Sequence, residues 1–113
     1  MLISNLELLR HIKDEVDFVL VHTDGKSQEE MMEDEVLCRA VIRSLEIIGE
    51  ASKKLEEDFK SDHPEIEWKK MAQTRDRVIH HYFGVDYDII WDIIKARLPE
   101  LQDRISDILH GEH

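Results

Sequence analysis

The chain has 113 residues, with 26 acidic side chains against 15 basic ones and a formal net charge of -11. That length fits one domain spanning residues 1–113. The acidic balance argues against a broad nucleic-acid-binding face but leaves room for a small basic site. Cys38 can form no internal disulfide, and no run approaches the roughly 18–20 apolar residues of a membrane span. We therefore expect a cytoplasmic protein with no membrane partner.

The first helix is predicted from Ser4 to about His22. Ser4 and Glu7 fit the S-x-x-E capping box, in which each side chain bonds to the other residue's backbone. Apolar residues follow at three- and four-residue spacing, as on the buried face of an amphipathic helix. The turn at residues 23–25 ends this pattern.

A second helical region opens with the same motif at Ser27 and Glu30. A long apolar stripe from Leu37 to Phe59 follows, and as one helix it could span the whole domain. Gly49 lies inside this stripe, where glycine costs about 1 kcal/mol relative to alanine. A close helix crossing is the expected reason for its presence.

The second half of the chain predicts further helices. A third helical region follows Pro64 and stops at Gly84, a plausible residue just beyond a helix end. Asp86 can cap the next helix, which Pro99 must kink or restart before it continues to Gly111. Strand-like alternation is absent. The expected fold is all-α, an antiparallel bundle of four or five helices around one core.

The segment from Arg75 to Tyr82 concentrates the residues that could carry chemistry. Continuing the apolar seam of the third region places Arg75 inside it, and Tyr82 lies two turns further on nearly the same face. A guanidinium keeps its proton and needs partners. Those partners could be a carboxylate of the bundle such as Glu46 or Glu50, a facing subunit, or an anionic ligand.

His80 offers an acid/base group in the same segment. On an ideal helix it lies roughly 140° away from Arg75 but one turn after Asp76, whose carboxylate could orient the imidazole. Arg75 and His80 can therefore meet one ligand only if the helix end is distorted or a second chain completes the site.

The run Arg75-Asp-Arg-Val-Ile-His80-His-Tyr82 matches the R-x4-H-x-Y form of the signature of HEPN-domain ribonucleases, as seen in HepT-like toxins. The segment 39–51 is similar to the family's second-helix signature. Trp68 and the run Tyr82-Phe-Gly-Val-Asp86 followed by residues 90–94 also fit. The resemblance covers about residues 34–109 and implies a single HEPN/HepT-like helical domain.

The resemblance implies an endoribonuclease that uses neither a metal nor another cofactor. Such enzymes cleave RNA by attack of the ribose 2′-hydroxyl on the adjacent phosphate. Carried onto this sequence, His80 would move the proton at the attacking or leaving oxygen, and Arg75 would stabilise the charge that develops on the phosphorane. The family is typically a homodimer with both motifs facing one cleft. RNA is then the expected substrate and DNA is not.

HepT-like proteins are usually paired with a small nucleotidyltransferase antitoxin of the MNT kind, so the resemblance implies the same partner here. The resemblance implies that this antitoxin transfers AMP to the tyrosine that corresponds to Tyr82. The added phosphate would compete with RNA for Arg75. The alternative is a non-catalytic helical module that dimerises and docks the nucleotidyltransferase, and the very acidic surface favours it modestly.

Overall fold

A computed structural model describes residues 3–80 and 84–111, with Ile79 and His80 described by their backbone alone. The described chain is almost entirely helical, as expected for an all-α protein. The elements in chain order are α1 (Asn5–Thr23), α2 (Gln28–Glu33), α3 (Glu35–Lys54), α4 (Glu57–Asp62), α5 (Trp68–Ala72), α6 (Thr74–Val78), β1 (Ile79–His80), β2 (Gly84–Val85), α7 (Tyr87–Asp92), the π-helical turn η1 (Ile93–Arg97) and α8 (Leu98–Gly111).

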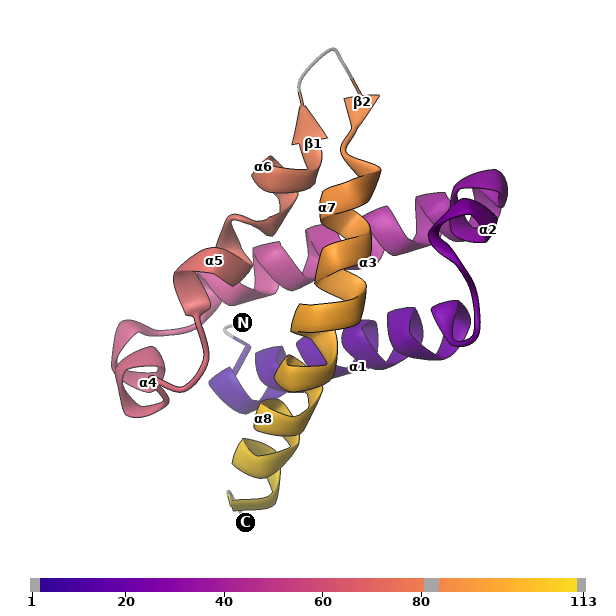
Figure 1. The fold of residues 1–113 in the computed structure, drawn as a ribbon. Coiled ribbons are helices and arrows are strands. Elements are labelled where there is room, and N and C mark those ends of the chain that lie inside the picture. Colours follow the sequence, from indigo (N-terminus) through magenta and orange to yellow (C-terminus); the bar gives the residue numbers. More distant parts are fainter. Residues whose placement is uncertain (1–2, 81–83, 112–113) are drawn as a thin grey trace.

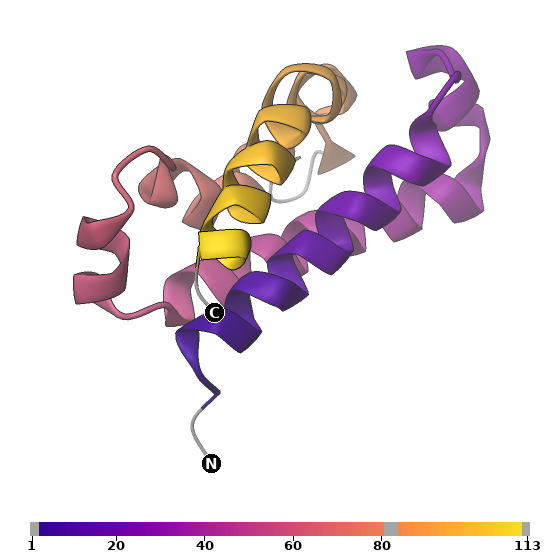
Figure 2. The ribbon, with the colours of Figure 1, turned by 90° about the horizontal axis from the view of Figure 1, so that it is seen from below.

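Two long helices form the base of the molecule, and a third rod crosses them. α1 and α3 run side by side in opposite directions, and the continuous rod of α7, η1 and α8 lies across them (Figures 1 and 2). Apolar side chains from α1, α3 and this rod meet between them and are almost completely buried, among them Leu9, Ile12, Leu45, Ile48, Ile90, Ile94 and Ile105. Burial of this apolar surface is the main force that holds the helices together.

The first two helices begin where their capping residues predict. The Ser4 hydroxyl accepts a hydrogen bond from the Glu7 amide at 3.1 Å. At Ser27 both halves of the capping box are formed, since the Ser27 hydroxyl accepts from the Glu30 amide and the Glu30 carboxylate accepts from the Ser27 amide. α1 ends at Thr23, one residue beyond the predicted end.

The single long helix predicted between residues 28 and 59 is wrong, because Asp34 interrupts it. Its carboxylate accepts a hydrogen bond from the Leu37 amide at 3.0 Å, so Asp34 ends α2 and caps α3 at once. α3 then ends at Lys54, and Phe59 belongs to α4. An aspartate that bonds to a backbone amide three residues ahead favours a new helix start over continuation.

Gly49 lies where α3 passes α5, as the sequence indicated. A Cβ atom built on Gly49 would lie 3.5 Å from the carbonyl oxygen of Met71 and 3.6 Å from that of Ala72. These are ordinary van der Waals separations. The crossing is therefore close, but it leaves room for a methyl group.

Pro99 perturbs its helix without ending it. A proline has no amide hydrogen, so it cannot bond to the carbonyl group four residues earlier. Directly before it, the amide of Leu98 bonds to the Ile93 carbonyl five residues back, which makes the turn π-helical. α8 continues without a break to Gly111. No helix in the described part of the chain is long and apolar enough to cross a bilayer.

Candidate functional site

The segment that carries Arg75 is not the single helix that the apolar seam predicted. It is divided into α5 and α6 with Gln73 between them, and α6 ends at Val78. β1 and β2 then form a two-stranded antiparallel ribbon that projects from the body of the molecule (Figure 1). In this ribbon His80 pairs with Gly84 and Ile79 pairs with Val85. The prediction that a helix continues to Gly84 is therefore wrong.

Gly84 permits the ribbon in place of the helix end that we expected. Its φ is +94°, a backbone conformation that residues with a Cβ atom rarely adopt. The β-branched Ile79, the first residue of β1, also favours extended structure. Glycine thus allows the chain to reverse here, but through a strand pair.

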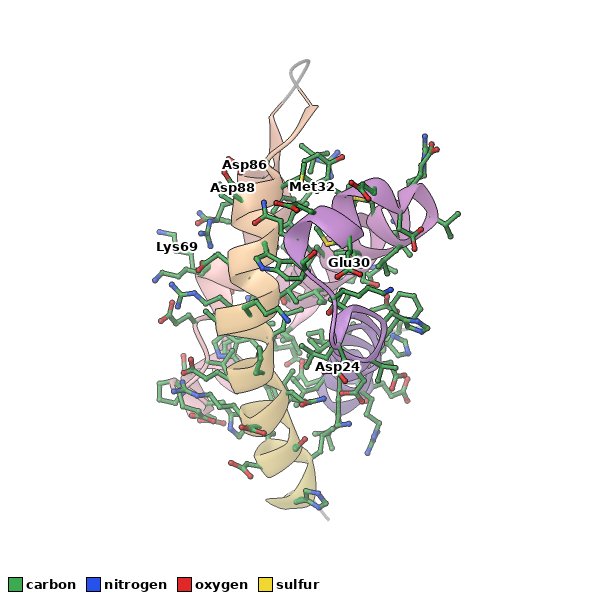
Figure 3. All side chains as sticks on the ribbon, turned by 45° about the vertical axis from the view of Figure 1, so that its right-hand side comes forward. Asp24, Glu30, Met32, Lys69, Asp86 and Asp88 are labelled. Atoms are coloured by element: carbon green, nitrogen blue, oxygen red, sulfur yellow. The ribbon has the colours of Figure 1, made fainter. Side chains whose placement is uncertain are left out.

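The base of the ribbon is fixed to the core. Val78 is completely buried, and its carbonyl oxygen accepts a hydrogen bond from the Asp86 amide at 2.8 Å. The Asp86 carboxylate accepts from the Ile89 amide at 3.0 Å, so Asp86 caps α7 as predicted. Figure 3 places Asp86 at the end of α7 from which the ribbon projects. The position of the ribbon is therefore set by one buried side chain and one helix cap.

The start of the segment is held equally well. The indole nitrogen of Trp68 donates hydrogen bonds to the carbonyl oxygens of Lys60 and His63, at 3.1 and 2.9 Å. The Thr74 hydroxyl is buried and donates to the Lys70 carbonyl at 3.2 Å, which bridges the break between α5 and α6. Arg75 is thus carried by a short helix whose two ends are both anchored.

Arg75 itself is half exposed, with 49% of its side chain accessible. Its Nε atom lies 3.5 Å from a carboxylate oxygen of Glu46 on α3, and its Nη1 atom lies 3.9 Å from an oxygen of Asp76. A guanidinium has five N–H donors, and this contact uses the Nε edge. Asp76 approaches Nη1 only to 3.9 Å, so the Nη side is weakly engaged and can still meet another anion.

Placing Arg75 inside the apolar seam was wrong. The break at Gln73 shifts the helical phase, so that Thr74 and Val78 continue the buried face of α6 and Arg75 lies beside it. The alternative partner considered from the sequence, Glu46, does bind Arg75. An ion pair this exposed contributes little to stability, and it leaves the cation accessible.

The backbone at His80 changes the geometry argued from an ideal helix. Because α6 ends at Val78, the 140° separation from Arg75 no longer applies, and neither does the one-turn relation to Asp76. Asp76 is exposed, and its carboxylate lies 3.9 Å from Nη1 of Arg75. The helix end is distorted, which was one of the two conditions for Arg75 and His80 to meet one ligand.

Tyr82 lies outside the described residues. The other tyrosine, Tyr87 at the start of α7, is half-buried against the core. The neighbouring Cys38 raises the pKa of Tyr87 through its charge, and burial and a hydrogen bond to Cys38 raise it further. The phenol of Tyr87 is thus engaged inside the fold, with Cys38 as a buried core residue, as expected.

A second cationic feature was missed from the sequence. A wide, open hollow of about 780 Å³ lies between the end of α3, α4 and α5. Its basic lining residues are Lys53, Lys60, Lys69 and Lys70. Lys69 and Lys70 are neighbours in the sequence, but Lys53 and Lys60 come from other helices. Across the residues that the structure describes, no three His, Cys, Asp or Glu side chains gather in an arrangement that could hold a metal ion.

The fold and the segment together define a class of protein, a small helical domain in which a short helix with an accessible arginine is followed by a strand that contains a histidine. Residues 7–108 match the family model described as "Ribonuclease HepT-like". The chain belongs to this family of HepT-like ribonucleases.

Relatives similar to this chain carry names that agree with this assignment. "Putative RNase TTE0752" of Caldanaerobacter subterraneus subsp. tengcongensis is 46% identical over 92% of this chain and 93% of its own length. "Putative RNase MJ0127" of Methanocaldococcus jannaschii is 45% identical over 90% and 84%. "Probable ribonuclease HepT" of Thermococcus cleftensis is 40% identical over 93% and 96%. No solved structure matches the chain.

Proposed function

We propose that this chain is a metal-independent endoribonuclease, the toxin of a HepT/MNT-type toxin–antitoxin pair. The observation that carries the proposal is an accessible guanidinium on a short anchored helix, α6, which is followed directly by the strand of His80. Membership of the HepT-like ribonuclease family supports RNA as the substrate. It also supports the R-x4-H spacing as the reacting pair.

The proposed reaction is an internal transfer of the phosphodiester. The 2′-oxygen of a ribose attacks the adjacent phosphorus while His80, as general base, takes its proton. The bond from phosphorus to the 5′-oxygen breaks, and that oxygen receives a proton from the protonated form of His80. The products are a 2′,3′-cyclic phosphate and a free 5′-hydroxyl. Arg75 donates charge-assisted hydrogen bonds to the phosphorane, where negative charge is greatest. Asp76 is proposed to orient the site electrostatically from beside Arg75.

A homodimer is part of the proposal, with the motifs of two copies facing one cleft. Mixing Arg75→Ala and His80→Ala proteins tests whether the two residues act from different protomers. Random exchange makes half of the dimers mixed, and a composite cleft would be intact at one of their two sites. The expected recovery is about a quarter of wild-type activity. No recovery would place both residues of each site on one chain.

The proposed regulation is adenylylation of Tyr82 by the nucleotidyltransferase antitoxin. The phenol oxygen attacks the α-phosphorus of ATP, and pyrophosphate leaves. The product places a phosphodiester and a nucleoside seven residues after Arg75, so that it competes with RNA for the same cation.

The experiment that tests nuclease function is an RNA cleavage assay with EDTA present. Wild-type protein is expected to cut, and Arg75→Ala and His80→Ala are each expected to lose at least about 100-fold in rate. Arg77→Ala is the matched control, because Arg77 faces a separate groove lined by η1 and α8. Cleavage that survives His80→Ala would refute this mechanism. A wild type that cuts nothing would favour the binding module, for which the Arg75–Glu46 ion pair is a structural contact.

A further inference from the structure

The lining of the hollow between α3, α4 and α5 has a net positive charge. Four lysines and two glutamates line it, in a protein whose net charge is -11. Each glutamate is already paired, Glu57 with Lys60 at 3.2 Å and Glu67 with Lys70 at 2.8 Å. The hydrogen bond from Lys70 and its charge lower the pKa of Glu67. The negative charge of this carboxylate is therefore balanced by Lys70.

Two cations remain after these pairs are counted. Lys53 and Lys69 are exposed and make no ion pair within the described residues. Figure 3 shows Lys69 projecting outward from the body of the molecule. Lys53 comes from the last turn of α3 and Lys69 from α5, so only the fold brings them to one hollow. Their unpaired charges attract an anion from solution.

The hollow lies further along α3 from the residue that binds Arg75. On α3, Lys53 follows Glu46 by seven residues, which places both on one face about 10 Å apart. Gly49 lies on that face between them and contacts the backbone of α5. Glu46, which binds Arg75 of α6, and Lys53, which lines the hollow, therefore lie along one face of α3 with the contact to α5 between them.

We propose that this hollow binds the phosphate backbone of the single-stranded RNA that extends from the bond held at Arg75, with Lys53 and Lys69 as the contacting groups. The proposal rests on the proposed nuclease function and names a binding surface for its substrate. A linear polyanion fits better than a compact one, because the cations are spread along a seam. No aromatic face is offered to the bases, since Trp68 is buried and hydrogen-bonded, so the surface reads charge and not sequence.

The test is the salt dependence of RNA binding in the His80→Ala background, in which the RNA stays intact. The probe is a labelled single-stranded oligouridylate. Each phosphate contact on a single strand contributes about 0.7 to the slope of log K against log salt. Lys53→Gln/Lys69→Gln is expected to lower that slope by about 1.4 and to weaken binding at low salt.

The control has the same change of net charge elsewhere. Lys26→Gln/Lys95→Gln removes two lysines from the turn after α1 and from η1, neither of which lines the hollow. It is expected to leave the slope as in the parent. Equal slopes for all three proteins, or equal losses in both double variants, would overturn the proposal. If only the Lys53→Gln/Lys69→Gln variant loses binding, and the protein with His80 intact cuts no RNA, the nuclease function is refuted and the RNA-binding surface stands.

Discussion

Arg75 binds Glu46 through its Nε edge, so one carboxylate of α3 positions the guanidinium without covering it. Glu46 is itself only 28% exposed, whereas Arg75 is 49% exposed. The pair is therefore asymmetric, with the anion partly under the cation. An incoming phosphate would meet the Nη side, which Asp76 approaches only to 3.9 Å, and a net charge that both carboxylates reduce.

Glu46→Gln is expected to strengthen RNA binding about two- to fivefold. The amide oxygen can still accept from Nε, but the negative charge that competes with phosphate is gone, and exposed pairs are worth about 0.2–1 kcal/mol. Binding is measured in the His80→Ala background. Glu50→Gln is the matched control, because Glu50 is exposed on the same helix and makes no ion pair with Arg75. Equal gains in both variants would mean that only net charge matters.

Gly49→Ala is expected to stabilise the protein by about 0.5–1 kcal/mol. The new methyl group meets the Met71 and Ala72 carbonyl oxygens at ordinary contact distance, while alanine is the better helix former. Gly84→Ala is the contrasting variant and is expected to destabilise by about 1 kcal/mol, because its φ is +94°. Urea unfolding measures both. A loss of stability in Gly49→Ala would mean that the α3–α5 crossing has no room for the methyl group.

Asp17 is expected to make stability depend on acid pH. Burial raises the pKa of its carboxyl group, but hydrogen bonds from Gln102 and Lys13 and the charge of Lys13 lower it more. A pKa lower in the folded than in the unfolded state stabilises the protein above the unfolded value, about 3.9, and this is lost as the pH falls through the folded value.

Asp17→Asn is therefore expected to destabilise at pH 7 by less than about 1 kcal/mol, since the side chain is about a third exposed. The difference from wild type is expected to shrink near pH 3. Urea unfolding at the two pH values gives the comparison. Asp14→Asn, an exposed position on the same helix, provides the control. A deficit that is the same at both pH values would contradict the ionic origin.

Tyr82→Phe is expected to abolish adenylylation, whereas Tyr87→Phe is expected to leave it intact. The phenol of Tyr87 is half-buried, and the neighbouring Cys38 raises its pKa, which makes it a poor nucleophile. Intact-protein mass spectrometry after incubation with the nucleotidyltransferase and ATP reports the modification. An AMP-sized mass increase that persists in Tyr82→Phe would move the target to another residue.

The sequence alone was sufficient for the helical class and for the local starts of helices. Ser4, Ser27 and Asp86 cap their helices as predicted, because a cap depends on residues only three positions apart. The R-x4-H-x-Y segment likewise identified the family, which the match over residues 7–108 supports. Such features are encoded within a few residues and need no knowledge of the fold.

Tertiary structure decided what periodicity could not. The cap at Asp34 is local and was overlooked because the apolar stripe runs past it. The end of α6 at the buried Val78, which puts His80 in a strand, depends on the core. The exposure of Arg75 follows from a phase shift at Gln73, and the meeting of Lys53 with Lys69 follows from the packing of α3 against α5. A helical repeat gives only the direction of a side chain around its own axis. Its burial and its partners depend on segments far away in the chain, which become neighbours only when the core forms.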